Sequence, residues 1–474
     1  MATARYGRAV TLSRSAVDDA VRYFDTWLAY RQQLDRVPGV QAAVLHETDV
    51  VLSTAHGLAD VEAGTPLDTY HRFRIASHSK TFTATAVVRL AERGVLRLDD
   101  PVSQWLTFLA DTGLARVTLR ELLSHAGGVV RDGWDGDFWQ LFRPFPDHDE
   151  LCRVALDAAA VLPRNERFKY SNIGYSLLGL VIEAATGEPF GRHVERELLQ
   201  PLGLDHTLPD LDPSGGHLAA GYSALSYADH RVPIEHVHTG AMAAATGFAS
   251  TATDVVRWAA AHFLGDERIV SDDAKRQMQR TEWEVEGTGG SGYGLGFAVA
   301  TIGSRRMLGH GGGYPGHITR TFFDPVDRLA VSVLTNSIDG PALAMATALV
   351  RLVDLAAQGP GPAPDAGLAR FRGRFASLWG VFDVVDLGGR LVQIDPSQPD
   401  PAAAPAHLEV IDERTLRLAR TTGYGSSGER LVFEFDDHGR PTRVRGGSGT
   451  TAVPIEGVTE AMRGRDRVRV GDSF

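Results

Sequence analysis

The feature of this sequence that most restricts its fold is a series of apolar segments with strand character between residues 293 and 335. Only short turns separate these segments, so each strand must run antiparallel to the one before it. The strands expected here are Tyr293–Ala300, Arg305–His310, Ile318–Phe323 and Leu329–Thr335. Two buried strands, Val40–Leu45 and Val50–Thr54, form an earlier hairpin. The sequence therefore predicts an antiparallel sheet.

Helical patterns surround these strands. Apolar residues recur at helical spacing from about residue 14 to 36, after Ser77, from Tyr175 to Ile182 before a stop at Gly187, and from about 341 to 357. A chain of 474 residues is also long for one core. We therefore expect an α+β fold in which helices flank the sheet and a mostly helical subdomain adjoins it.

A second, all-β domain is expected after a linker. The stretch 358–365 is rich in glycine and proline, which is typical of linkers. Beyond it, short segments of alternating polarity predict a small barrel. These segments are Val381–Asp386, Leu391–Ile394, Leu416–Leu418, Leu431–Phe435, Val444 and Arg467–Val470. The predicted division is a first domain of residues 1–357, a linker of 358–366 and a barrel domain of 367–474.

Composition excludes several classes of partner. The net charge is −11, and the arginines are scattered among acidic residues, which gives no basic surface for nucleic acid or an anionic membrane. No apolar run reaches the length of a membrane span, and Met1–Arg8 lacks the apolar core of a signal peptide, so we expect a cytoplasmic location.

The single cysteine, Cys152, excludes internal disulfides, and its surroundings in the sequence predict that it packs within a helix. The sequence defines no oligomeric state.

The chemistry of the chain is organised around Ser77 and Lys80. If the helix begins at Ser77, the two side chains lie on one face of its first turn. A serine hydroxyl becomes a nucleophile when a nearby base removes its proton, and a desolvated lysine is such a base. The chain has only three lysines and otherwise uses arginine, which cannot give up its proton. A lysine at position 80 therefore has a chemical reason to be a lysine.

Two further segments hold candidate site residues. Tyr170 and Asn172 come just before a helix; taken alone, Asn172 reads as a helix cap and Tyr170 as a core residue. The loop Arg131–Gln140 holds three acids and two tryptophans among glycines. Such a loop either lines a substrate cleft that receives a cationic group or uses its aromatic residues to fix a long surface loop.

Other motifs do not carry function. Gly423–Gly428 and Gly311–Gly316 fit the dinucleotide-binding expression, but neither is followed by the helix that this fold requires. His236 and His238 lack a third metal ligand nearby and read as exposed histidines. There is no Gly-x-Ser-x-Gly elbow, which disfavours an α/β-hydrolase.

Three segments in a fixed order resemble the motifs of one superfamily: Ser77-x-x-Lys80, Tyr170-Ser-Asn172, and Gly309-His-Gly-Gly-Gly313 in the turn after a strand. They are similar to those of the serine β-lactamases and penicillin-binding proteins, specifically the class C-like branch with D-aminopeptidases, D-peptidases and esterases. Further similar segments are Leu122–Gly128, Gln200–Leu204, Ala220–Tyr222, Ser250–Val255 and Tyr293–Phe297, within about residues 15 to 357. The barrel resembles the lipocalin-like domain of some of these peptidases and of stand-alone peptide cyclases.

The resemblance implies a role for each site residue. Ser77 is the acylated nucleophile and Lys80 its proton acceptor, while Tyr170 passes the proton to the leaving group, assisted by Lys80 and His310. Asn172 holds the amide or ester group of the substrate. The backbone N–H groups of Ser77 and Gly313 form the oxyanion hole. No metal or organic cofactor is implied.

The third motif departs from the pattern of the best-known members of the superfamily, since His310-Gly-Gly replaces Lys-Thr-Gly. The missing lysine and threonine help to bind the carboxylate of β-lactams in related proteins, so their absence argues against β-lactamase activity. A histidine titrates near neutrality and, when neutral, shares a hydrogen bond with the hydroxyl of Tyr170. The alternative is that His310 only fills a turn among glycines.

Three functions follow from these expectations. The first is a serine hydrolase that cleaves an amide or ester, with a small peptide or D-amino-acid derivative as its substrate. The second is an acyltransferase or peptide cyclase of the penicillin-binding-protein-type thioesterase kind, in which an amine replaces water. The third is a non-catalytic binding protein, which the retention of nucleophile, base and tyrosine disfavours. The first two share every residue named here.

Overall fold

The computed structural model describes residues 12–157, 160–210, 216–359, 368–421, 425–447 and 449–463. These residues cluster into two compact units. The first, called the sheet unit below, comprises residues 35–346. The second, called the barrel unit, combines the described parts of 1–34 and 347–474. The boundaries inferred from composition, at residues 357 and 367, stay a prediction.

The sheet unit is built on an antiparallel sheet whose nine strands, within the described residues, follow the order β3-β2-β1-β13-β12-β11-β10-β9-β8. The bounds are β1 (Gly39–His46), β2 (Asp49–Asp60), β3 (Thr65–Pro66), β8 (Trp283–Glu284), β9 (Gly292–Tyr293), β10 (Ala298–Ile302), β11 (Arg305–Tyr314), β12 (His317–Asp324) and β13 (Leu329–Thr335). Every pairing in this sheet is antiparallel. The predicted antiparallel sheet is confirmed.

Three details of the sheet differ from the prediction. Residues 294–297 separate β9 from β10, so the segment expected as one strand is two. β2 is only partly buried because it lies near the margin of the sheet, whereas β1 is buried along its whole length. The motif Gly309–Gly313 lies within β11 and not in the turn after it. That turn follows at Pro315 and Gly316.

Helices of the sheet unit enclose its core. α10 packs on β1, β12 and β13, and α2 lies against α6 and α9. Two two-stranded pairings join distant segments, β4 (Phe73–Arg74) with β7 (Ala249–Ser250) and β5 (Gly221–Tyr222) with β6 (Pro233–Ile234). The helix bounds are α2 (Ser79–Glu92), α3 (Val102–Trp105), α4 (Leu119–Leu123), α5 (His148–Asp157), α6 (Asn172–Thr186), α7 (Phe190–Val194), α8 (Gln200–Leu202), α9 (Ala243–Thr246), α10 (Ala252–Ala260) and α11 (Asp272–Gln279).

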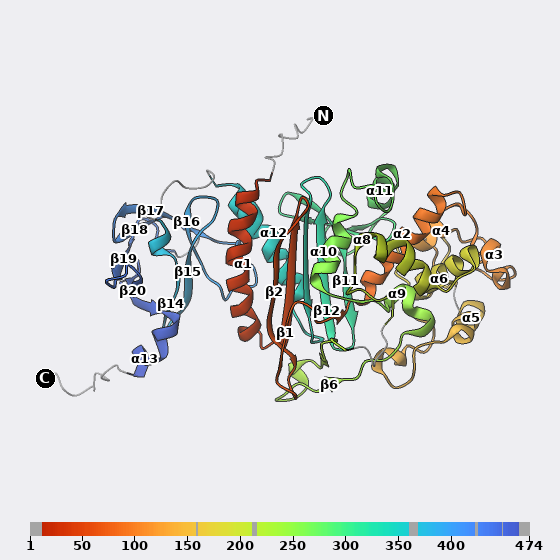
Figure 1. The fold of residues 1–474 in the computed structure, drawn as a ribbon, viewed down its shortest axis with the longest axis horizontal. Helices are drawn as coiled ribbons and strands as arrows, with labels where there is room; N and C mark the ends of the chain where they lie inside the picture. The colour runs from red at the N-terminus through yellow and green to blue at the C-terminus, as the bar shows by residue number, and fades with distance from the viewer. Residues whose placement is uncertain are drawn as a thin grey trace. The chain divides into compact units, whose positions relative to one another are not determined.

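The barrel unit contains a closed barrel of eight antiparallel strands, β14 to β21, that pair in chain order (Figure 1). The bounds are β14 (Gly373–Ser377), β15 (Gly380–Asp386), β16 (Leu391–Ile394), β17 (Ala406–Asp412), β18 (Thr415–Arg420), β19 (Arg430–Phe435), β20 (Pro441–Arg445) and β21 (Thr451–Pro454). The predicted barrel is confirmed, although the sequence pattern does not predict β14, β17 and β21. The expected strand Arg467–Val470 lies outside the described residues, as do Gly423 and Tyr424 of the glycine-rich segment Gly423–Gly428.

Helices also belong to the barrel unit. α1 (Arg14–Leu34) ends two residues before the predicted 36, and a short α13 (Val458–Arg463) follows the last strand. The Tyr23 hydroxyl on α1 donates a hydrogen bond to Asp383 Oδ2 at 2.9 Å, and Trp27 Nε1 donates to the Pro396 carbonyl at 3.1 Å. These buried contacts tie α1 to the barrel. The division between the two units falls inside α12 (Ala342–Ala357), the helix expected at 341–357.

Candidate active site

Ser77 lies in a single 3-10 turn, Ala76–His78, and α2 begins directly after it at Ser79. The sequence predicts the start of the helix at Ser77, two residues too early. Ala76 has a φ of 47°, a conformation that an alanine adopts only under strain and that often occurs at functional sites. Ser77 and Lys80 still lie three residues apart on one side of the turn.

Strand β11 approaches the backbone just before Ser77. A Cβ atom at Gly312 would lie 2.2 Å from the Ile75 carbonyl oxygen, closer than any side chain allows. Glycine is therefore required at position 312, because the strand contacts the turn through its bare backbone. The same contact brings the sequence-predicted residues His310 and Gly313, on β11, to the element that carries Ser77.

Lys80 is buried, and its amine lies among three oxygen atoms. Nζ is 3.2 Å from Ser77 Oγ, 2.7 Å from Asn172 Oδ1 and 2.8 Å from the Ala245 carbonyl oxygen. Burial lowers the pKa of Lys80 well below its usual value; the carboxylate of Asp132 opposes this shift. A neutral amine has two N–H groups and one lone pair. Because Asn172 Oδ1 and the Ala245 carbonyl can only accept, the lone pair is left for the Ser77 hydroxyl.

Asn172 is oriented by Asp132, a residue to which the sequence pattern gave no role of its own. Asn172 Nδ2 donates to Asp132 Oδ1 at 2.6 Å, so its Oδ1 faces Lys80. Asp132 also accepts from Trp139 Nε1 at 3.0 Å. The helix cap of α6 is Ser171, whose Oγ accepts from the Gly174 N–H at 2.8 Å, and not Asn172. The capping interpretation of Asn172 is wrong, since its side chain faces the site.

Tyr170 completes the arrangement at Ser77. Its hydroxyl donates to Ser77 Oγ at 2.9 Å. Burial raises the pKa of Tyr170 well above its usual value, so the phenol stays protonated at neutral pH. Lys80 Nζ also lies 4.8 Å from the centre of the Tyr170 ring, a cation–π distance when the amine is charged. Ser77 Oγ is thus placed between a proton acceptor and a proton donor.

His310 is buried next to these residues, but its ring nitrogens have other partners than expected. Nδ1 lies 2.6 Å from the Gly311 carbonyl oxygen and must carry the proton, so Nε2 accepts from the Tyr293 hydroxyl at 3.1 Å. The rings of His310 and Tyr170 lie 6.3 Å apart, and the described residues include no hydrogen bond between them. Burial lowers the pKa of His310 well below its usual value, and a proton on Lys80 would lower it further. His310 is therefore neutral at neutral pH.

Aromatic side chains fill the space behind Tyr170. His125 is buried in van der Waals contact with Tyr170 and Tyr293, at ring distances of 4.4 and 4.8 Å. Its Nδ1 accepts from the Ser171 N–H at 3.2 Å. The sequence signals for His125 and Tyr293 were their positions in the segments Leu122–Gly128 and Tyr293–Phe297, but residue types alone gave them no role. They hold Tyr170 in place by packing.

A cavity of about 470 Å³ lies next to Gly313. Its lining is mostly apolar and aromatic: Trp139, Leu141, Tyr227, Ile234, Tyr314 and Ile338 contribute to it. Trp139 and Gln140 of the loop Arg131–Gln140 line this cavity, and the binding of a cationic group by the loop stays a prediction. Asp132 and Trp139 belong to the site, whereas Phe138 is buried as a packing residue and Trp134 is 80% exposed.

The two histidines set aside as metal ligands do not form such a site. His236 is partly buried and not exposed as expected; its Nε2 lies 3.0 Å from the Ala219 carbonyl oxygen, and burial lowers its pKa to about 4. Across the described ranges, no three His, Cys, Asp or Glu side chains converge as a metal ion would need. In the same part of the chain, no helix has both the length and the apolar composition of a membrane span.

The comparisons with known proteins agree with this geometry. The family model described as Beta-lactamase matches residues 24–355, which is more than half of the chain. The chain belongs to the beta-lactamase family. Esterase EstB of Burkholderia gladioli is 34% identical over 189 residues, which cover 36% of this chain and 46% of EstB. The matches span about half the length of the curated relatives.

Similarity to solved structures extends over most of the chain. The octameric penicillin-binding protein homologue from Pyrococcus abyssi superposes with a TM-score of 0.65 at 24% identity, over 90% of this chain and 97% of that one. SurE superposes with a TM-score of 0.60 at 26% identity, over 93% of this chain and 99% of SurE. The predicted β-lactamase-like fold followed by a barrel is confirmed.

Proposed function

We propose that this protein is a serine hydrolase that cleaves an amide or ester bond through an acyl-enzyme on Ser77. The observation that carries this proposal is the position of Ser77 Oγ, 3.2 Å from Lys80 Nζ and 2.9 Å from the Tyr170 hydroxyl. A nucleophile within reach of both a base and an acid meets the geometric requirement for acyl transfer. Burial favours the neutral amine of Lys80, which can accept a proton, and the protonated phenol of Tyr170, which can donate one.

Acylation follows from these contacts. Neutral Lys80 accepts the proton of the Ser77 hydroxyl as Oγ bonds to the substrate carbonyl carbon. The N–H groups of Ser77 and Gly313 are the proposed donors to the resulting oxyanion. Tyr170 then gives its proton to the leaving nitrogen or oxygen as the C–N or C–O bond breaks, and Lys80 returns a proton to Tyr170.

Deacylation repeats these steps with water. Water gives one proton to Lys80, which is neutral again after acylation, as the water oxygen bonds to the acyl carbon. Ser77 Oγ then leaves the acyl carbon and takes its proton back from Lys80. The product is a free carboxylic acid. An amine in place of water would give an amide, which is the acyl-transfer alternative, and the same residues would serve it.

The proposed substrate is a small peptide or D-amino-acid derivative with an apolar side chain. The cavity next to Gly313 supports the apolar part, because its lining is mostly aromatic and aliphatic. EstB is named an esterase, and SurE has a solved structure with D-Leu. His310 is neutral and adds no charge that would hold a substrate carboxylate, which supports uncharged substrates over β-lactams.

Product analysis tests this proposal. The protein is incubated with L- and D-phenylalanine amide, their short-chain ester analogues and benzylpenicillin, with and without an added amine nucleophile. We expect free acid from amides or esters and little turnover of the penicillin, and Ser77→Ala should abolish all turnover. Turnover that survives in Ser77→Ala would overturn the nucleophile, and products formed only with the amine would replace hydrolysis by acyl transfer.

A further inference from the structure

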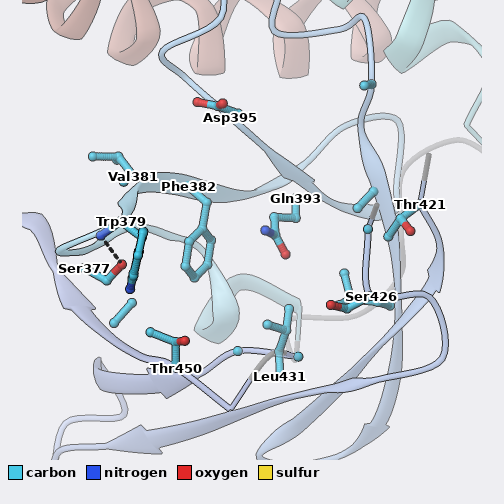
Figure 2. Close-up of a pocket in the computed structure, with 18 of the residues that line it drawn as sticks. Ser377, Trp379, Val381, Phe382, Gln393, Asp395, Thr421, Ser426, Leu431 and Thr450 are labelled. Carbon is cyan, nitrogen blue, oxygen red and sulfur yellow. Dashed lines mark hydrogen bonds between the residues drawn. The ribbon is translucent and has the colours of Figure 1, made fainter. Parts of the chain in front are cut away.

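The barrel unit encloses a cavity of about 1050 Å³ that the proposed hydrolase chemistry does not use. Figure 2 shows Phe382, Gln393, Leu431 and Thr450 around this cavity. Eight-stranded barrels are either filled by their own side chains or wide enough for one small ligand. The volume lies in the range of ligand sites, so the contents of the barrel interior decide between the two cases.

Among the described residues, side chains fill the barrel interior at one end only. Side chains alternate along a strand, so Phe375 and Ser377 of β14 both face inward, as do Leu431 and Phe433 of β19. Phe375 and Phe433 pack together with Phe371 in the apolar core. Ser377, two residues after Phe375, and Leu431, two residues before Phe433, line the cavity.

Small residues create the space at the other end of the barrel. Ala406 of β17 and Ala452 of β21 line the cavity at positions where larger inward side chains would fill it. Leu418 and Leu431 form an apolar floor, and both are buried in the barrel core. The cavity therefore results from the choice of residues at inward positions.

Gln393 gives this cavity a polar anchor. It stands at an inward position of β16, two residues after the core residue Leu391, and points into the cavity (Figure 2). Its Oε1 is buried and has no hydrogen-bond partner among the described residues. A buried acceptor without a partner is destabilising, so a ligand that brings an N–H or O–H donor gains binding energy when the Gln393 side chain turns its Oε1 toward it.

The charge of the lining restricts the ligand further. Asp395 is the one ionisable residue among the described residues that line the cavity, and Trp379 and Phe382 add aromatic surface. A negatively charged ligand such as a fatty acid would find no cation here and one carboxylate to repel it. A peptide group offers the N–H that Gln393 Oε1 lacks, and apolar side chains match the floor.

We propose that the barrel unit is a binding site for short apolar peptides without a net negative charge. The Gln393 amide pairs with a backbone N–H of the peptide, and Phe382, Leu418 and Leu431 contact its side chains. This site is built from residues of the barrel alone and does not depend on the proposed chemistry at Ser77.

Calorimetric titration of the full chain tests this site. The probe is N-acetyl-leucyl-phenylalanine amide, which is neutral, and the protein carries Ser77→Ala so that the probe is not consumed. Gln393→Leu keeps the size of the side chain and removes the acceptor, and Ala406→Phe fills the cavity. Gln33→Leu, an exposed glutamine of α1 in the same unit, is the matched control.

We expect Gln393→Leu to weaken binding about tenfold, the effect of one lost hydrogen bond. Ala406→Phe should abolish the same binding event, and Gln33→Leu should leave it unchanged. The probe with a free C-terminal carboxylate should bind more weakly. Circular dichroism checks each fold; if Ala406→Phe does not fold, Gln393→Leu alone decides.

Any binding near Ser77 is common to all variants, so only differences between them report the barrel. Binding that is equal in the Gln393→Leu, Ala406→Phe and control proteins would overturn the proposal. The proposal would also be overturned if the Ser77→Ala parent did not bind the probe. That result would show that the cavity holds only water. Neither result depends on whether the protein turns over a substrate.

Discussion

Asp132 Oδ1 lies 2.6 Å from Asn172 Nδ2, and this contact determines which end of the Asn172 amide faces Lys80. A carboxylate can only accept, so the amide nitrogen must point to Asp132 and the amide oxygen to the lysine. That oxygen accepts one N–H of the Lys80 amine at 2.7 Å. The base that acts on Ser77 is thus oriented by a residue that has no contact with Ser77 itself.

The first prediction concerns Asp132. In Asp132→Asn the new amide can present either end, so Asn172 can turn its nitrogen toward Lys80 and lose the hydrogen bond that orients the amine. We expect kcat to fall about tenfold or more, with a smaller change in KM. Asp137→Asn, an exposed acid of the same loop, is the control. Equal kinetics in the two variants would show that Asp132 does not position the base.

The second prediction concerns Lys80. Arginine keeps the charge at this position but cannot accept a proton. Lys80→Arg should therefore be nearly as inactive as Lys80→Ala in steady-state assays. Lys169→Arg, at a partly buried lysine one residue before Tyr170, should keep its activity. Substantial turnover by folded Lys80→Arg would make the lysine an electrostatic group and not the base.

The third prediction concerns His310 and Tyr293, which share a hydrogen bond of 3.1 Å. We propose that the pair supports the position of Tyr170, so His310→Ala should lower kcat, by about a hundredfold if the acid–base step depends on it. Tyr293→Phe should act in the same direction. The effects of two residues in one network do not add, so the double variant should be little worse than His310→Ala. Near-normal kcat in His310→Ala would leave this histidine a structural residue.

Much of this fold follows from local sequence patterns. The strands between 305 and 335, the hairpin β1–β2 and the helices α1 and α12 are marked by apolar periodicity and turns that need no distant partner. β14, β17 and β21 could not be predicted in this way, because their inward residues are few or small. Ala406 and Ala452, for example, carry little hydrophobic signal, and their strand conformation depends on closure of the barrel.

The site likewise has residues that the sequence predicts and contacts that only the fold determines. Ser77, Lys80 and Tyr170 are brought together as expected, since a motif order specifies them. The partner of Asn172 could not be found, because Asp132 is one of three acids in its loop and only the fold selects it. The partner of His310 was wrongly expected to be Tyr170, since which hydroxyl meets a ring nitrogen depends on side-chain directions that sequence spacing does not contain.

The fourth prediction concerns stability at low pH. Burial lowers the pKa of His262 from 6.5 to about 4, so the folded chain binds fewer protons there than the unfolded chain. Stability is therefore complete above about pH 6.5 and falls as the pH drops toward about 4, by up to about 3 kcal/mol from this group.

Removing His262 should weaken this dependence. His262→Gln lowers stability at neutral pH through its lost contacts with Thr85 and Trp258, yet its unfolding free energy should change less between neutral and acidic pH. His148→Gln, at an exposed histidine, should keep the wild-type slope. Denaturant unfolding followed by circular dichroism measures both; an unchanged slope in His262→Gln would mean that this histidine is not held neutral.

We propose that Ser77 forms a covalent bond with the acyl group of the substrate. The most direct test is to treat the protein with a serine-reactive phosphonate and to locate the adduct by mass spectrometry of its peptides. We expect one phosphonate per chain, on Ser77, and no adduct in Ser77→Ala, while Ser79→Ala still reacts. An adduct on another residue, or labelling that persists in Ser77→Ala, would contradict it.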